Sequence, residues 1–226
     1  MRDVARHFSF IFIKNYKSEF KAMNILRIYP SSINSRSIAE AVETLRDGGL
    51  VIYPTDGLYA LGCDALNNRA IEKICHIKDI DPRRNSLSIV CADISQASEY
   101  ARIDNRAFGI MKRVLPGPFT LLLPASTTLP KVFKGRKVVG VRVPDNPIPR
   151  ALAEALGAPL LSTTAMTPEE IEEDGPGSEP VAVKYASVAD LMLDGGEGGS
   201  EPSTVFDLTD SSMPEILSQG AGRLEL

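Results

Sequence analysis

Short stretches of the chain combine hydroxyl, cationic and turn-forming residues at points where predicted strands or helices end. Functional groups often gather at such ends in open α/β sheets. In the first stretch, Thr55 follows an apolar run, where its hydroxyl could bind a carboxylate or a phosphate. Its neighbours Pro54, Asp56 and Gly57 are turn formers, so a plain turn is the alternative interpretation.

A basic loop follows the next predicted helix. Lys78, Arg83 and Arg84 lie within seven residues of one another. Such a loop could neutralise a triphosphate, because an arginine can hold phosphate oxygens through two parallel hydrogen bonds. A solvated surface loop is the alternative.

Arg142 and a hydroxyl-rich strand end complete the set of candidates. Arg142 is flanked by valines in a predicted strand, and arginine is seldom buried without a partner. It therefore either pairs with an internal acid or faces a cleft. Ser162, Thr163 and Thr164 follow another apolar run. Together with backbone N–H groups they could form an anion-binding nest, or they could be an ordinary polar strand end.

The elements that must position these residues alternate between helical and strand-like patterns. This alternation predicts an α/β sandwich with most of its sheet buried. Residues 167–180 are acidic and rich in Gly and Pro, which predicts a flexible loop. We expect helices at 35–47, 67–78, 94–101, 107–115 and 149–156, and strands at 50–53, 59–63, 86–91, 119–123, 138–143, 159–162, 190–194, 204–208 and 216–217.

Composition limits the class of protein. The chain has 226 residues, 43% of them hydrophobic, which suits one domain at 23–226, with residues 1–22 as an extension outside the fold or an interaction arm. No apolar run reaches the roughly 18 residues of a membrane helix. Three cysteines without a CxxC pair argue against disulfides or a zinc site and favour the cytoplasm. The chain has only two histidines, and this scarcity disfavours a histidine-based metal cluster or a Ser-His-Asp triad.

Charge is distributed unevenly along the chain. Residues 1–166 hold 23 basic and 15 acidic residues, whereas residues 167–226 hold 2 basic and 14 acidic ones. A basic body with an acidic C-terminal part could favour a polyanion on one face. An ordinary mixed surface with a solvated acidic segment is the alternative.

Taken together, five stretches resemble the YrdC/YciO-like family of threonylcarbamoyl-AMP synthases, and the form of the first is closest to the YciO branch. The stretches occur in the family's order and are YPTDGLYALGC (53–63), LPGPFTLLLP (115–124), VGVRVPDNP (139–147), PLLSTTA (159–165) and PSTVFDLT (202–209). The resemblance implies one domain with a twisted, mixed sheet flanked by helices and a concave, electropositive groove.

The resemblance also implies a reaction. L-threonine, bicarbonate and ATP, with Mg²⁺, would give threonylcarbamoyl-AMP and pyrophosphate for N6-threonylcarbamoyladenosine modification of tRNA. Family members are reported to bind double-stranded RNA, so a protein that binds such RNA or tRNA with little or no synthase activity is the alternative. The oligomeric state does not follow from the sequence.

Roles for individual residues follow from the resemblance by position. Arg142 would hold the threonine carboxylate, and Thr55 would lie in the threonine and bicarbonate pocket. The other residues implied at the substrate and ATP site are Tyr59, Lys78 at the phosphates, Arg83 or Arg84 in place of a family arginine, Val138 at the nucleotide through its backbone, and Ser162 and Thr164 at the acyl phosphate.

Four positions depart from the family pattern. Ile80 stands where the family has an arginine, Met166 where it has an asparagine, Gly57 where it has a threonine, and Ser218 where it has an arginine. Each charge-assisted contact that is lost typically costs about 1.5–3 kcal/mol. The departures would therefore weaken the handling of ATP or redirect the site to another ligand.

Overall fold

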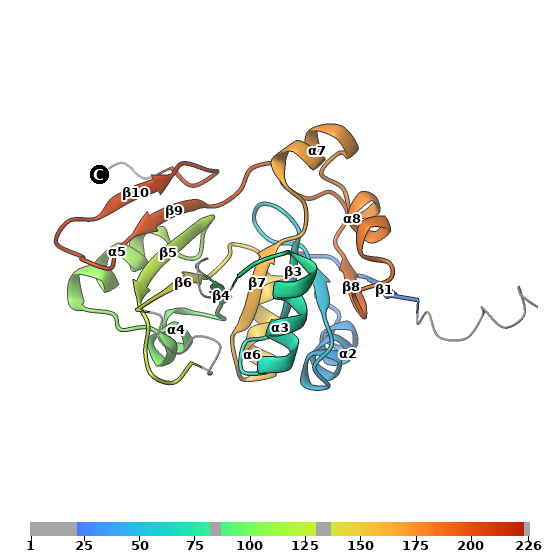
Figure 1. Ribbon diagram of the computed structural model, residues 1–226, viewed down its shortest axis with the longest axis horizontal. Coiled ribbons are helices and arrows are strands. Elements are labelled where there is room, and N and C mark those ends of the chain that lie inside the picture. Colours follow the sequence, from blue (N-terminus) through green and yellow to red (C-terminus); the bar gives the residue numbers. More distant parts are fainter. Residues whose placement is uncertain (1–21, 82–86, 130–136, 224–226) are drawn as a thin grey trace, which may run out of the picture.

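The computed structural model describes residues 22–81, 87–129 and 137–223, which form one α/β domain around a ten-stranded mixed sheet. The strand order is β1-β8-β2-β3-β7-β4-β6-β5-β9-β10. Figure 1 shows β1 and β8 at one end of the molecule and β9 and β10 at the other. The strands are β1 (Asn24–Arg27), β2 (Val51–Tyr53), β3 (Ala60–Asp64), β4 (Ser88–Val90), β5 (Phe119–Pro124), β6 (Val138–Arg142), β7 (Leu160–Thr164), β8 (Leu191–Asp194), β9 (Thr204–Asp207) and β10 (Glu215–Ser218).

Pairing in the centre of the sheet brings distant stretches of the sequence together. β4 is parallel to β6 and antiparallel to β7. Ser88 is therefore in register with Gly140 on one side and with Ser162 on the other. The hydroxyl-rich strand end and the strand that holds Arg142 therefore lie on either side of the start of β4. Residues in register across these strands point to the same face of the sheet.

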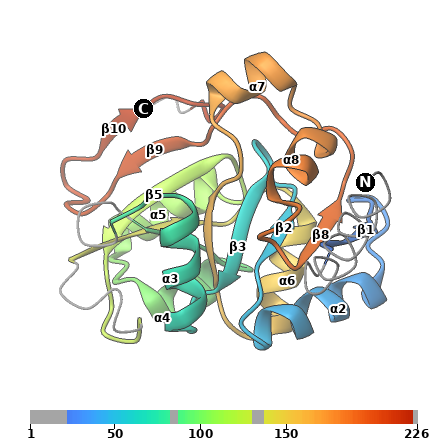
Figure 2. The ribbon, with the colours of Figure 1, turned by 45° about the vertical axis from the view of Figure 1, so that its right-hand side comes forward.

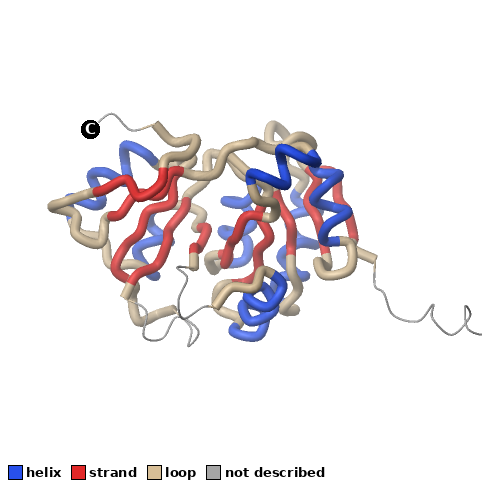
Figure 3. Tube along the Cα trace, turned by 45° about the horizontal axis from the view of Figure 1, so that its top comes forward, coloured by secondary structure: helices blue, strands red, loops and turns tan. Residues whose placement is uncertain are grey.

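Helices cover both faces of the sheet, and Figure 3 shows the strands as a band with helices on either side. α2 and α6 pack against each other over one face (Figure 2). α3, α4, α5 and α8 contribute to the core on the other face. The helices are α2 (Ser35–Arg46), α3 (Asn68–Ile77), α4 (Ile94–Tyr100), α5 (Asn105–Val114), α6 (Pro147–Leu156), α7 (Pro168–Asp174) and α8 (Ser178–Tyr185).

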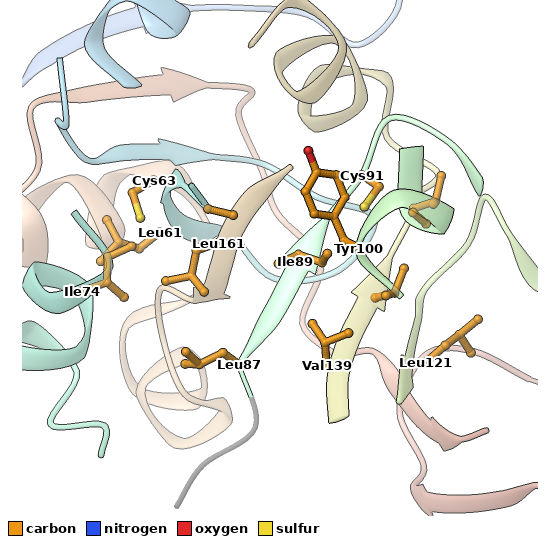
Figure 4. Close-up of a cluster of buried hydrophobic side chains, with 14 of the residues drawn as sticks. Leu61, Cys63, Ile74, Leu87, Ile89, Cys91, Tyr100, Leu121, Val139 and Leu161 are labelled. Atoms are coloured by element: carbon orange, nitrogen blue, oxygen red, sulfur yellow. The ribbon is translucent and has the colours of Figure 1, made fainter. Parts of the chain in front are cut away.

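Alternation along the strands divides the apolar residues between two cores. In β7, Leu161 points into the core under α3, whereas Leu160 points into the core under α2 and α6. Figure 4 shows the first core, in which Leu161 and Ile89 lie between Ile74 of α3 and Val139 of β6. The apolar runs in the sequence are thus buried on both faces, as expected for a covered sheet.

Most predicted elements are present, with ends that differ by one or two residues. Asn67 begins α3 by accepting a hydrogen bond from Ala70 N, and Gly157 ends α6 in the left-handed conformation. β1 was not predicted. It is a short edge strand whose residues are mostly exposed, and β8 is its one partner among the described strands, so its sequence lacks the signal of a buried strand.

The prediction of a flexible loop at 167–180 is wrong. This segment forms α7 and the start of α8. Thr167 accepts a hydrogen bond from Glu170 N, and the Glu170 carboxylate accepts one from Thr167 N, which together form a capping box. Pro168 occupies the first turn, where the missing N–H is tolerated. The prolines and glycines therefore mark the ends of helices.

Three further expectations concern the N-terminal extension with Arg83 and Arg84, the cysteines, and membrane-spanning helices. Residues 1–21 of the predicted extension, together with Arg83 and Arg84, lie outside the described residues. Cys63, Cys75 and Cys91 are all buried. None of the helices in the described ranges is long and apolar enough to cross a membrane.

Candidate functional site

A cavity of about 290 Å³ lies beside the start of β4 and is rich in hydroxyl groups. Serines and threonines of β4, β5, β7 and the segment before β9 form much of its wall, and Arg142 is the one cationic residue among the described residues that line it. The lining comprises Ile74, Ile80, Leu87, Ser88, Thr120, Arg142, Leu161, Ser162, Thr163, Thr164, Pro202, Ser203, Val205 and Ser218. The structure thus brings three predicted site residues, Arg142, Ser162 and Thr164, into one cavity.

Arg142 both faces this cavity and pairs with an internal acid, which joins the two alternatives raised by the sequence. Its Nη2 donates a hydrogen bond to Asp56 Oδ1 at 2.8 Å, and the two side chains are only 10% and 7% exposed. The other oxygen, Asp56 Oδ2, accepts a hydrogen bond from Asp145 N at 2.7 Å. Arg142 Nε is buried without a hydrogen-bond partner among the described residues.

Thr55 builds the turn that carries Asp56. Its hydroxyl donates to the carbonyl of Leu58 at 2.8 Å and accepts a hydrogen bond from Gly57 N at 3.1 Å. The Asn146 amide donates to the carbonyl of Thr55. The turn interpretation of this stretch is therefore confirmed, and Thr55 does not line the cavity of Arg142. Its role as a direct substrate contact stays a prediction.

The turn also explains why Gly57 replaces a larger residue. A Cβ at this position would lie 2.8 Å from the carbonyl oxygen of Glu201, and Gly199 N donates a hydrogen bond to the carbonyl of Gly57. The segment before β9 packs directly on this glycine. A threonine here would require that segment to move.

Tyr53 adds a second buried polar atom without a partner. Its hydroxyl makes no hydrogen bond to the described residues. Burial raises the pKa of the Tyr53 phenol, and nearby Ser162 and Arg142 oppose that rise. A Cβ on Gly62 would lie 2.7 Å from the Tyr53 hydroxyl, so the glycine makes room for the ring. The Tyr53 hydroxyl and Arg142 Nε are thus both buried polar atoms close to the hydroxyl-rich strand end.

The wall opposite β7 is held by a close backbone approach and a hydrogen bond. A Cβ on Gly140 would lie 2.5 Å from Ser88 Oγ, so the glycine leaves room for that hydroxyl. The hydroxyls of Thr120 and Ser203 lie 2.7 Å apart and share a hydrogen bond. Ser88, Thr120 and Ser203 are not among the predicted site residues, because their place at the cavity depends on how the strands pair.

In the sequence, Lys78 lies between Ile74 and Ile80, which both line the cavity, but its ammonium contacts residues outside that lining. Its Nζ donates to the carbonyl of Ala165 and to the Tyr185 hydroxyl, both at 3.4 Å. Lys184 Nζ donates to the same carbonyl at 3.1 Å. Burial, followed by the neighbouring Lys184 cation, lowers the pKa of Lys78. The lysine is thus held one residue beyond Thr164, at long hydrogen-bond distances.

The remaining predicted residues lie elsewhere. The Tyr59 hydroxyl donates to the carbonyl of Gly196 and accepts a hydrogen bond from Gly195 N, which fixes the loop after β8. Burial raises the pKa of Tyr59 to about 12. Val138 is half-buried in β6 and does not line the cavity. Among the positions that depart from the family pattern, Ile80 and Ser218 line the cavity, whereas Met166 does not.

Comparison with known proteins identifies the family to which the chain belongs. The family model Sua5_yciO_yrdC, described as "Telomere recombination", matches residues 43–220. The chain belongs to this Sua5/YciO/YrdC family. The "Uncharacterized protein YciO" of Escherichia coli (strain K12) is 41% identical over 198 residues, which are 86% of this chain and 94% of that protein. The "Threonylcarbamoyl-AMP synthase" of Vibrio vulnificus (strain YJ016) is 32% identical over 81% of this chain and 98% of its own length.

Solved structures of the Sua5/YciO/YrdC family share the fold. The crystal structure of E. coli YciO matches with a TM-score of 0.76 and 37% identity, over 89% of this chain and 97% of that one. The crystal structure of P. abyssi Sua5 complexed with L-threonine matches with a TM-score of 0.76 and 32% identity, over 87% of this chain and 57% of that one. The predicted fold and family are therefore confirmed.

Proposed function

We propose that the cavity at Arg142 binds L-threonine, and that the protein makes threonylcarbamoyl-AMP and pyrophosphate from threonine, bicarbonate and ATP. The observation that carries this proposal is a largely buried arginine that lines a cavity whose wall is rich in hydroxyl groups. Such a group suits a carboxylate, because a guanidinium forms strong charge-assisted hydrogen bonds with carboxylate oxygens. The threonine complex of P. abyssi Sua5, a member of the same family, supports the choice of ligand.

The chemistry requires positioning and charge stabilisation more than a protein nucleophile. Threonine's amine and bicarbonate form a carbamate with loss of water. A carbamate oxygen then attacks the α-phosphorus of ATP, and the bond from that phosphorus to the leaving pyrophosphate breaks. Arg142 would orient the threonine through its carboxylate, and Ser162 and Thr164 would donate hydrogen bonds to the mixed anhydride.

Lys78 is the described cation best placed to face the phosphates. Its two hydrogen bonds are long, and a lysine with a lowered pKa gains by pairing with an anion. In this proposal the ammonium exchanges the Ala165 carbonyl and the Tyr185 hydroxyl for phosphate oxygens.

A Mg²⁺ ion would be held chiefly by the phosphates of ATP. Within the described ranges, no group of three or more His, Cys, Asp or Glu side chains could hold a metal ion. Mg²⁺ commonly binds in this way, through substrate phosphates and water with few protein ligands.

The test is release of pyrophosphate from ATP that depends on both threonine and bicarbonate. We expect Arg142→Ala to raise the threonine concentration needed for half-maximal rate, and Lys78→Ala to slow release at saturating threonine. Arg69→Ala removes an exposed arginine on α3 and serves as the matched control. Release that is unchanged by both site variants would contradict the residue assignment, and release without threonine would contradict the reaction.

The charge distribution favours a second candidate function, binding of double-stranded RNA or tRNA. Residues 1–166 hold eight more basic than acidic residues. If the protein neutralises RNA phosphates, its affinity will fall steeply as salt rises, because counterions are released on binding. Salt-independent binding, or no binding to duplex RNA or tRNA, would contradict this second function.

A further inference from the structure

A second cavity, of about 690 Å³, lies where β4 and β6 end, apart from the site at Arg142. β4 and β6 are parallel neighbours, so their carboxyl ends meet at the same edge of the sheet. After β4 the chain enters α4, whose buried residues join the core under α3 and α5. After β6 it enters α6, whose buried residues join the core on the opposite face.

This arrangement is a topological switch point. Where the helices that follow two adjacent parallel strands pass to opposite faces of a sheet, a crevice remains at the carboxyl ends of those strands. Open α/β sheets bind ligands in such crevices. The cavity is lined by Val143 just after β6 and by Ala92 just after β4, which places it in the crevice.

The walls combine apolar side chains with an exposed aromatic ring. Ile94, Ile103, Leu115 and Val143 line the cavity, and Phe108 of α5 is 46% exposed there. The volume also falls within the roughly 300–1,000 Å³ that is typical of sites for small molecules.

Arg150 supplies the polar group that such a site needs. It lies on α6 and lines the cavity, and its Nε has no hydrogen-bond partner among the described residues. Its Nε is buried, and a buried donor without a partner costs free energy that a bound acceptor would recover. A second cation, Lys112, lies with Nζ 5.8 Å from the centre of the Phe108 ring.

Two carboxylates in the lining are committed to other partners. Asp93 accepts a hydrogen bond from Gln96 N and caps α4. Asp104 accepts hydrogen bonds from Arg106 N and Ala107 N, and from the Ser211 hydroxyl. These hydrogen bonds lower the pKa of Asp104. Both carboxylates keep their negative charge but are held at the starts of α4 and α5 by these hydrogen bonds, and Arg150 and Lys112 are the cations in the lining.

We propose that this cavity binds a small organic anion, in which a carboxylate or phosphate monoester is joined to an apolar or aromatic group. Arg150 would accept the anion through its guanidinium, and Phe108, Ile103 and Leu115 would cover the apolar part. The proposal concerns a site separate from the threonine cavity and does not depend on the proposed synthase activity.

The test uses phenyl phosphate and benzoate as probes, with benzyl alcohol as the neutral analogue, titrated into the isotopically labelled full chain and followed by NMR. We expect saturable shifts of the amides of Ser95, Ser98 and Phe108 with one or both anions, and much weaker binding of benzyl alcohol. The comparison of the two anions shows which acid group the site accepts. The absence of saturable shifts, or shifts confined to the Arg142 cavity, would overturn the proposal.

Variants test the roles of the two side chains. Arg150→Gln should weaken binding of the anion about tenfold or more, because a charge-assisted contact is lost. Phe108→Ala changes a half-exposed ring and should weaken binding without unfolding the chain. Arg36→Gln, an exposed arginine on α2, is the matched control and should bind as the wild type does. Equal affinity of the wild type and Arg150→Gln would overturn the proposal, and the wild-type shifts decide the matter if that variant does not fold.

Discussion

Asp56 and Arg142 form a buried ion pair that joins the turn after β2 to the end of β6, across 86 residues of sequence. The carboxylate uses its two oxygens to hold the end of β6 and the loop that follows it, because it accepts hydrogen bonds from both Arg142 Nη2 and Asp145 N. It therefore fixes the guanidinium beside the cavity. In the proposed reaction Asp56 acts as a positioning residue for the Arg142 side chain, which lines the cavity.

This ion pair gives the first prediction. Asp56→Ala leaves the Arg142 charge buried without its partner, so the free energy of unfolding should fall by about 3–5 kcal/mol. Urea denaturation measures the change. Asp145→Ala removes an exposed carboxylate from the loop after β6, which Asp56 holds, and the free energy of unfolding should stay within about 0.5 kcal/mol of the wild type. Similar losses for the two variants would show that the ion pair does not anchor the loop.

The space around Gly62 gives the second prediction. A Cβ at this position would lie 2.7 Å from the Tyr53 hydroxyl and 2.9 Å from the Leu161 carbonyl oxygen, so Gly62→Ala should lower the free energy of unfolding by about 1–3 kcal/mol. Gly109→Ala lies within α5 and meets nothing within 4 Å, so it should raise stability by about 0.4–1 kcal/mol. Thermal unfolding of both variants compares them. A stabilised Gly62→Ala protein would mean that the Tyr53 ring does not lie over this strand.

The lowered pKa of Lys78 gives the third prediction. The ammonium is charged below its pKa and loses its proton as the pH rises through that value, which lies below the ordinary 10.5 of a lysine. If the charge stabilises the phosphates, kcat/KM for ATP, which reports the ligand-free protein, should fall with rising pH earlier than an ordinary lysine would cause. A pH profile of kcat/KM measures this.

Lys78→Arg provides the control for that profile, because an arginine stays protonated over the same range. Its profile should lack the alkaline decline, even where its rate is lower at neutral pH. An identical decline in both proteins would assign the titration to another group.

The capping box of α7 gives the fourth prediction. Thr167→Ala removes the side-chain acceptor for Glu170 N, which should cost about 0.5–2 kcal/mol of helix stability. Because α7 buries none of its residues, the loss should remain local. Amide hydrogen exchange should speed up over 168–174 but not in α6. Thr209→Ala, an exposed hydroxyl outside any helix, should leave exchange in α7 unchanged.

The sequence predicts most of the central fold because the strands are apolar runs buried on both faces. It does not predict β1, whose exposed edge position carries no such pattern. It also misassigns α7, where acidic residues, proline and glycine imitate a loop although the capping box starts a helix. Composition describes a segment on average, whereas capping depends on individual residues at a fixed spacing.

The candidate site is predictable only in part, for a related reason. A charged residue between two valines already indicates that Arg142 needs a partner or a cleft. That the partner is Asp56 is seen only in the folded chain, where the turn after β2 reaches the end of β6 although β3, β7 and β4 lie between these two strands in the sheet. Likewise, Ser88 reaches the cavity through its register with Gly140 and Ser162. Local sequence contains no signal for either relationship.

The most direct test of the central claim is a crystal structure of the protein soaked with L-threonine. We expect threonine in the cavity beside β6 and β7, with its carboxylate accepting a hydrogen bond from the Arg142 guanidinium while Asp56 keeps its contact with Asp145 N. Threonine bound elsewhere, or a cavity that stays empty at saturating threonine, would contradict the assignment of Arg142 as the residue that holds the substrate.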